Sequence, residues 1–211
     1  MDLVLAGLTW EVCLVYLDDV IVMADTFEQH LERLETVMNR LQRADLKLNL
    51  AKCKLFQLKT KFLGHVVSGR GIEPDPRKVR AVVDWPIPRN LIEARGFVAL
   101  ASYYCRFISF FADIARPIHL LTRKNQPFVW TDEQRESFER LKHYLVTAPV
   151  LSLPRDVGRY VFDTDANDEV LGLVLQQEQD DVLRVITYAS RALQTAERSY
   201  CTTRKELLAV I

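Results

Sequence analysis

The sequence predicts an α+β fold in two successive parts, and three observations support that class. Apolar runs rich in β-branched residues flank a tight turn at 12–15 and 20–23, which is typical of a β-hairpin. Apolar residues at helical spacing follow in 27–44 and in several stretches between 75 and 146. Three more strand patterns and a helical one come after Arg159, which indicates a second α+β or α/β unit.

In the first part, Thr26 followed by Gln29 resembles a capping box and predicts the start of an amphipathic helix that ends near Ala44. Alternating leucines at 46–50 predict a short strand. Residues 62–67 predict another strand, which turns at 68–71 where two glycines lie.

Prolines divide the middle of the chain into short helices. Asp75 as N-cap, with proline next, predicts a helix to Asp84. Residues 91–111 predict one or two more helices, and Thr131 caps another that ends near Val146. The aromatic stripe in 97–111 fits a packed core, with the alternative that Tyr103 or Arg106 faces a nucleic-acid groove.

In the last part, strands are predicted at 160–165, 170–176 and 184–188, followed by a helix over 195–211. The chain stops on apolar residues without a C-cap, so we expect it to be cut from a longer protein.

Composition narrows the class of protein. Hydrophobic residues make up 49% of the 211 residues and charged residues 27%, as in a soluble globular protein. No apolar run approaches the roughly 20 residues of a membrane span, and the N-terminus lacks the basic start of a secretory signal. The four cysteines and four histidines are scattered, so we expect reduced core thiols, no zinc centre and an intracellular protein.

The zero net charge hides a gradient along the chain. Residues 1–39 hold eight acidic residues and one basic residue, whereas residues 40–80 hold eleven basic residues and three acidic ones. An acidic turn followed by a basic stretch suits an enzyme that binds metal ions and backbone phosphates. A solvated basic face is the alternative.

The most informative motif is Tyr16-Leu17-Asp18-Asp19 at the predicted hairpin tip. Two adjacent carboxylates repel each other unless a cation offsets them, and Mg²⁺ prefers oxygen ligands. A solvated Asp-Asp turn is the alternative from these residues alone.

Collinear motifs across the chain resemble the Pol polyprotein of gypsy-class LTR retrotransposons and their retroviral relatives. They include Leu14–Val22 around the acidic turn, Leu48–Cys53, Phe62–His65, Tyr103–Ile108, Phe128–Thr131, Thr147–Leu151, Thr164–Ala166, Tyr188–Arg191 and Lys205–Ala209. The resemblance implies the C-terminal part of a reverse transcriptase palm (1–75), a helical thumb-like region (76–125) and a connection (126–158). A truncated N-terminal part of an RNase H-like α/β domain (159–211) then follows.

For the polymerase, the resemblance implies that Asp18 and Asp19 are two of three metal-binding aspartates, with Asp18 the firmer ligand. Two Mg²⁺ ions per active site are implied, and Mn²⁺ is an alternative. Tyr16 would lie near the primer end.

The motif Phe62-Leu63-Gly64-His65 falls where the family has its primer grip, which positions a strand without doing chemistry. Lys52, or alternatively Lys54, lies in the segment credited with protonating pyrophosphate. A phosphate-contacting or solvated lysine is the simpler interpretation.

For RNase H, Asp165 and Glu206 match two members of a carboxylate cluster that binds two metal ions. Asp163 lies two residues from Asp165 and therefore shares its face of a strand, so the motif alone favours Asp165. An exposed helix glutamate is the alternative for Glu206.

The implied function is that of an RNA-directed DNA polymerase with RNase H activity, expected to be inactive as this piece alone. The implied partners are an RNA/DNA hybrid and primer-template, dNTPs and the remainder of the polyprotein, with no membrane. The implied location is the cytoplasm, a virus-like particle or the nucleus. The alternative is a non-catalytic nucleic-acid-binding remnant of a retroelement.

Overall fold

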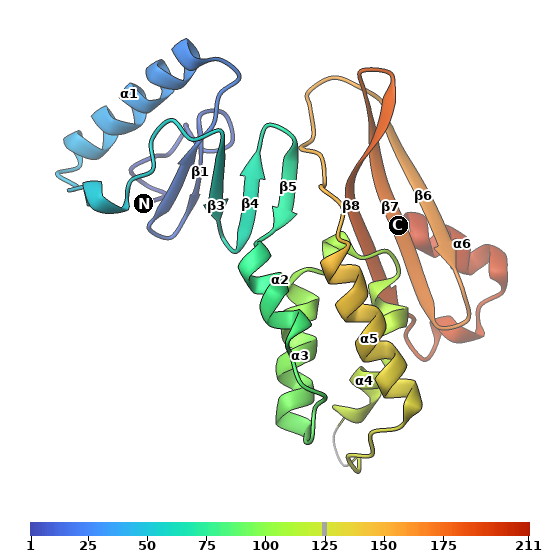
Figure 1. The fold of residues 1–211 in the computed structure, drawn as a ribbon. Helices are drawn as coiled ribbons and strands as arrows, with labels where there is room; N and C mark the ends of the chain where they lie inside the picture. The colour runs from blue at the N-terminus through green and yellow to red at the C-terminus, as the bar shows by residue number, and fades with distance from the viewer. Residues whose placement is uncertain (124–125) are drawn as a thin grey trace. The chain divides into compact units, whose positions relative to one another are not determined.

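A computed structural model describes residues 1–123 and 126–211, which form an α+β protein with two compact units, 1–62 and 63–211 (Figure 1). The predicted fold class is confirmed. The last two residues of the predicted thumb-like range, 124–125, lie outside the described residues. Each unit is described separately below.

The first unit is a hairpin packed against a helix. Strands β1 (Cys13–Tyr16) and β2 (Asp19–Val22) pair antiparallel, and α1 (Phe27–Arg43) follows. The predicted cap forms, because the Gln29 backbone N–H donates to Thr26 Oγ1 at 3.2 Å. Val37 and Leu41 of α1 bury against Leu5 and Cys13, all at most 4% exposed. This small core fixes the base of the hairpin and leaves its tip free.

Two predicted strands, at 46–50 and 62–67, differ from the structure. Residues 46–49 have no regular structure, and a 3₁₀ turn (Leu50–Lys52) follows. The alternation of leucines is present, but Leu50 is 76% exposed and no neighbouring strand among the described residues pairs with this stretch. The second prediction, one strand over 62–67, is right for 65–67 but wrong for Leu63 and Gly64, whose φ of 46° and 68° break the strand. Strand β3 (Lys59–Phe62) therefore ends before this turn, and β4 (His65–Ser68) begins after it.

The second unit begins with a hairpin and four helices. Strand β4 pairs with β5 (Gly71–Pro74), and the helices are α2 (Pro76–Val83), α3 (Leu91–Tyr103), α4 (Phe111–Leu121) and α5 (Asp132–Val146). The predicted caps are confirmed: Asp75 Oδ1 accepts the Arg77 N–H at 3.0 Å, and Thr131 forms a capping box with Gln134.

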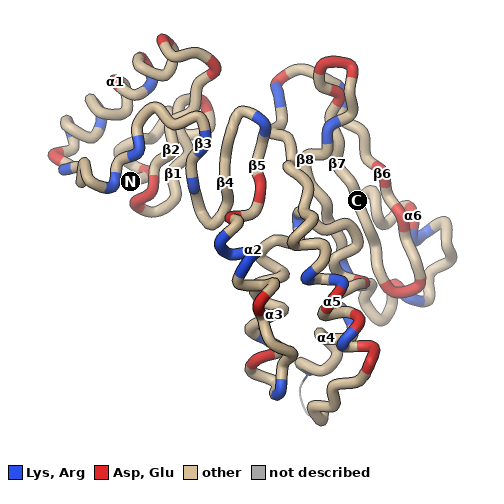
Figure 2. The backbone as a smooth tube through the Cα atoms, viewed as in Figure 1, with Lys and Arg blue, Asp and Glu red and all other residues tan. Residues whose placement is uncertain are grey.

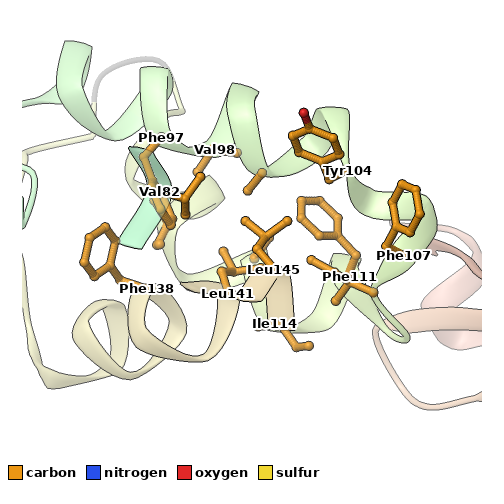
Figure 3. Close-up of a cluster of buried hydrophobic side chains, with 14 of the residues drawn as sticks. Val82, Phe97, Val98, Tyr104, Phe107, Phe111, Ile114, Phe138, Leu141 and Leu145 are labelled. Carbon is orange, nitrogen blue, oxygen red and sulfur yellow. The ribbon is translucent and has the colours of Figure 1, made fainter. Parts of the chain in front are cut away.

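The core of the second unit lies among these helices (Figure 3). Phe97 on α3 and Phe138 on α5 are both fully buried, with ring centroids 4.4 Å apart. Most of the aromatic stripe is core as expected, since Phe107 and Phe111 are buried too. Tyr103 is the exception, because half of its surface stays exposed.

The C-terminal part contains a three-stranded antiparallel sheet, in the order β6 (Tyr160–Ala166), β7 (Val170–Gln179), β8 (Val182–Ala192). The three predicted strands are confirmed and run longer than expected. Helix α6 (Thr202–Val210) packs against β6 and β7. It starts seven residues later than predicted, after a 3₁₀ turn (Glu197–Ser199).

None of the helices in 1–123 and 126–211 is long and apolar enough to cross a membrane. The prediction of core thiols is right only for Cys13. Cys53 is half-buried, and Cys105 and Cys201 are exposed.

Candidate metal and nucleic-acid sites

The tip of the β1–β2 hairpin presents the two adjacent carboxylates to solvent. Tyr16 pairs with Asp19 in the ladder, which leaves Leu17 and Asp18 to make the two-residue turn. Leu17 has a left-handed φ of 52°, as a primed hairpin turn requires at its first central position. Tyr16, Asp18 and Asp19 are all exposed. The strand register therefore fixes both aspartates at one point, where their oxygens suit a hard divalent cation.

The basic stretch after α1 lies mostly on the surface of the first unit. Figure 2 marks the charged positions along the backbone. Lys52, at the end of its 3₁₀ turn, and Lys54 are exposed. They can contact a phosphate backbone, and no carboxylate among the described residues forms an ion pair with either of them.

The sequence-predicted grip, Phe62–His65, forms a turn between two strands. Phe62 is the last residue of β3, and Leu63, Gly64 and His65 are half-buried in the second unit. The His65 ring stacks on Tyr103 and Phe107 with centroids 5.4 and 5.7 Å away, and its Nδ1 lies 2.7 Å from the Leu63 carbonyl oxygen. The His65 ring therefore packs against the end of α3 and contacts the backbone of the turn.

The surroundings of His65 oppose its protonation. Burial lowers the pKa of His65, the hydrogen bond to the Leu63 carbonyl raises it, and the charge of Arg106 lowers it further. Its Nε2 is buried without a hydrogen-bond partner among the described residues. His65 is therefore neutral when the protein is folded at neutral pH.

We expect this neutral histidine to make stability depend on pH. Because the folded pKa is lower than the unfolded value of about 6.5, the unfolded state binds more protons in that range, so stability is lost as pH falls below about 6.5. Urea unfolding of the second unit at pH 7.5 and 5.5 checks this. The loss should shrink in His65→Gln. Burial lowers the pKa of His119 too, so His119 also contributes to this pH dependence. The variant His119→Gln is measured in parallel to separate the two contributions. An unchanged pH dependence in His65→Gln contradicts the assignment.

The second carboxylate pair lies in the C-terminal sheet and its helix. Asp165 is exposed on β6, and Glu206 is half-buried on α6, the helix that packs against β6. Asp163, on the same strand, accepts a hydrogen bond from Gln176, whereas Asp165 has no hydrogen bond or ion pair within the described chain. A carboxylate without a protein partner can more readily bind a metal ion, so Asp165 stays the candidate of the two.

Helix α6 is tied to the turn that follows Asp165. Lys205 is 5% exposed, and its Nζ lies 2.7 Å from Asp168 Oδ1, in the loop between β6 and β7. This contact joins the helix that carries Glu206 to the loop that follows the strand carrying Asp165. The sequence analysis identified Glu206 but not the role of Lys205, because nothing in the sequence indicates that this lysine side chain is buried.

A feature that the sequence analysis missed lies beside Asp165. Asp165 pairs with Gly172 on β7, and Gly172 with Ser190 on β8, so these residues share one face of the sheet. The Phe110 ring covers Gly172 so closely that a Cβ there would lie 2.3 Å from it. The Ala112 N–H donates to Ser190 Oγ at 2.9 Å. The start of α4 is therefore packed on the face that carries Asp165.

Neither carboxylate pair is a complete metal site within the part of the chain that the structure describes. In 1–123 and 126–211 no group of three or more His, Cys, Asp or Glu side chains could hold a metal ion. Each pair offers oxygen ligands of the right chemistry, but further ligands would have to come from elsewhere.

Comparison with known families matches the two ends of the chain separately. Residues 1–67 match the reverse transcriptase (RNA-dependent DNA polymerase) family model. Residues 130–211 match the RNase H-like domain found in reverse transcriptase.

Curated relatives align over nearly the whole chain. The retrovirus-related Pol polyprotein from transposon 297 of Drosophila melanogaster is 39% identical over 100% of this chain and 20% of its own length. The Pol polyprotein from transposon gypsy of the same organism is 34% identical, over 100% of this chain and 21% of that protein. The Schizosaccharomyces pombe transposon Tf2-3 polyprotein is 31% identical over 93% of the chain and 15% of its own length. The chain thus spans between 15% and 21% of the length of these relatives.

Solved structures show the same fold. A foamy viral protease-reverse transcriptase dRH in complex with ds DNA superposes with a TM-score of 0.84 over 99% of this chain and 37% of that chain. The same kind of protein in complex with an RNA/DNA hybrid gives 0.83 over 99% and 28%. Both are 22% identical to this chain, so they establish the fold alone.

Proposed function

Since the chain belongs to the retrovirus-related Pol polyproteins, with a reverse transcriptase segment at 1–67 and an RNase H-like segment at 130–211, we propose that it serves RNA-directed DNA synthesis and RNA-strand hydrolysis. The observation that carries this proposal is the order of the two matches, each of which contains one pair of candidate carboxylates. We assign residues 1–75 to the palm, 76–125 to a thumb-like region, 126–158 to a connection and 159–211 to the RNase H-like domain.

In the polymerase, Asp18 and Asp19 would hold Mg²⁺, or Mn²⁺, at the hairpin tip. When bound, a pair of such ions supplies a more reactive primer 3′-hydroxyl and charge neutralisation at the leaving pyrophosphate of the dNTP. The protein contributes geometry: the short, paired strands β1 and β2 hold both carboxylates on a rigid turn. Tyr16, exposed on the same tip, would contact the primer end.

In the RNase H-like domain, Asp165 and Glu206 would hold the metal ions used to hydrolyse the RNA strand of a hybrid. The contact of α6 with β6, reinforced by Lys205 and Asp168, keeps their two elements together. Because each pair is only part of a ligand set, we expect the 211 residues alone to show little of either activity.

Nucleic acid would be bound through Lys52 and the turn at Phe62–His65. The chain would act inside the cell, in the cytoplasm, a virus-like particle or the nucleus, as part of a larger polyprotein. A second candidate is a remnant that binds a hybrid without catalysis, which the exposed basic stretch at 40–80 favours.

Binding of an RNA/DNA hybrid by this chain tests the shared part of both candidates. We expect binding that weakens with salt, and a shallower salt dependence, by about one to two in the log–log slope, in Lys52→Gln/Lys54→Gln. The matched control is Arg135→Gln/Arg140→Gln, which removes the same charge from the exposed side of α5. Absence of hybrid binding at low salt rules out both candidates for the isolated chain. Extension of a primer by the wild-type chain, lost in Asp18→Asn, would exclude the remnant.

A further inference from the structure

The turn at Leu63 and Gly64 has a backbone that needs outside support. Both residues have left-handed φ, 46° and 68°, and only glycine adopts this region without cost. Leu63 is therefore strained, and the surrounding structure has to hold it in place. A short strained turn in a binding segment keeps its shape only if neighbouring groups fix it.

Two tyrosines at the end of α3 supply that support. The Tyr103 hydroxyl donates to the Leu63 carbonyl at 2.5 Å, and the Tyr104 hydroxyl donates to the Gly64 carbonyl at 2.8 Å. The backbone N–H of Asp75 also donates to the Gly64 carbonyl, at 3.1 Å. Each carbonyl of the turn is thus bound by a residue 40 positions away in the sequence.

Packing fixes the tyrosines themselves. Tyr104 is 1% exposed and belongs to the core of the second unit (Figure 3). Burial, followed by the effects of Tyr103 and Asp75, raises the pKa of Tyr104 to about 12, so its hydroxyl keeps the proton it donates. The Tyr103 ring stacks on His65 at 27° between the ring planes.

The fit around Gly64 is close. A Cβ at this position would lie 3.3 Å from both Cε1 and the hydroxyl oxygen of Tyr103. Glycine therefore meets two needs at once, the left-handed φ and the approach of the tyrosine ring.

We propose that Tyr103 and Tyr104 are positioning residues that hold the Leu63–Gly64 turn in its nucleic-acid-binding shape. The proposal rests on the proposed function, in which this turn contacts the primer strand. It gives the paired tyrosines of α3 a role besides packing: their hydroxyls connect the buried helix core to a binding turn. The rings alone would fill the same space but would leave each carbonyl only its nearer partner, His65 Nδ1 for Leu63 and the Asp75 N–H for Gly64.

The test removes the two hydroxyls and keeps the rings, in Tyr103→Phe/Tyr104→Phe of the 211-residue chain. The matched control is Tyr144→Phe/Tyr160→Phe, whose hydroxyls make no hydrogen bond within the described chain. The Asp75 amide exchanges with solvent only when the turn opens, because its N–H donates to the Gly64 carbonyl. Loss of the two hydroxyl hydrogen bonds should raise the equilibrium constant for opening, and with it the exchange rate, by about tenfold. The control should leave it unchanged.

The functional readout uses an RNA/DNA hybrid with 2-aminopurine at the primer 3′ end and a fluorescein at the far template end. Fluorescein anisotropy measures affinity, and the 2-aminopurine fluorescence reports contact at the primer end. We expect the affinity of the tyrosine variant to stay within about threefold of wild type, because charge contacts dominate affinity. The change in 2-aminopurine fluorescence on binding should be mostly lost. A full 2-aminopurine response in the variant overturns the proposal.

A second result also overturns the proposal. If the variant binds more weakly and unfolds at a lower denaturant concentration, but gives the full 2-aminopurine response at saturation, the tyrosines act only in folding. If the wild type does not bind the hybrid at all, the proposed function fails first, and the positioning role fails with it. The two failures are thus told apart by the wild-type measurement.

Discussion

Asp18→Asn should lower DNA synthesis by at least about a hundredfold while leaving RNA hydrolysis unchanged, and Asp165→Asn should do the reverse. The effects are large because asparagine keeps the shape of the side chain but removes the charge that holds a divalent cation. They are separate because the aspartates lie in different units, Asp18 on the β1–β2 tip and Asp165 on β6.

These rates need a complete ligand set, so the 211 residues would replace the matching segment of the transposon 297 Pol polyprotein, with which they are 39% identical. Primer extension and hydrolysis of a labelled hybrid are measured on each variant. Asp163→Asn is the matched control, because Asp163 shares a strand face with Asp165 but is bound by Gln176. DNA synthesis that survives Asp18→Asn, or RNA hydrolysis that falls equally in Asp163→Asn, contradicts the assignment.

Gly71→Ala should destabilise the second unit by about 3 kcal/mol or more, because two costs combine. Gly71 has φ of 128°, a conformation that alanine strongly disfavours. Its Cβ would also lie 2.0 Å from the Leu151 carbonyl oxygen, which accepts the Ile72 N–H at 2.7 Å. The substitution therefore breaks the bridge that joins β5 to the segment after α5.

The matched control is Gly69→Ala, two residues away in the same hairpin. A Cβ at Gly69 would meet nothing within 4 Å, so we expect a change within about 0.5 kcal/mol. Urea unfolding followed by tryptophan fluorescence reports on the second unit, since Trp85 and Trp130 both pack against its core. Equal stabilities of the two variants would contradict the close approach at Gly71.

Local signals predicted most of the elements. The hairpin at 13–22, the cap at Asp75 with Pro76 and the capping box at Thr131 each depend on residues within a few positions, and all are confirmed. The strand patterns at 160–165, 170–176 and 184–188 are confirmed too, as β6, β7 and β8.

The errors arose where partners distant in sequence decide the structure. Residues 46–50 have the apolar alternation of a strand, yet no described strand pairs with them. Without a neighbouring strand to accept its backbone hydrogen bonds, this segment does not form a strand. The strand predicted over 62–67 breaks at Leu63 because hydroxyls 40 residues away stabilise a turn there. No window of sequence contains both halves of that contact.

The candidate sites divide in the same way. Asp18 and Asp19 are neighbours in sequence, so the motif placed them correctly on a hairpin tip. The surroundings of Asp165, with Phe110 over Gly172 and Lys205 bound to Asp168, come from four segments that are distant in sequence and could not be predicted. The catalytic and binding roles of all these residues stay predictions.

The central claim is that this chain is a segment of a longer Pol polyprotein, and the reading frame of its parent transcript tests that most directly. The account predicts that the frame continues upstream into a further acidic palm motif. It also predicts continuation downstream into the remaining RNase H carboxylates, so that each pair gains the ligands it lacks. In-frame stop codons immediately on both sides would contradict it and leave nucleic-acid binding as the only function.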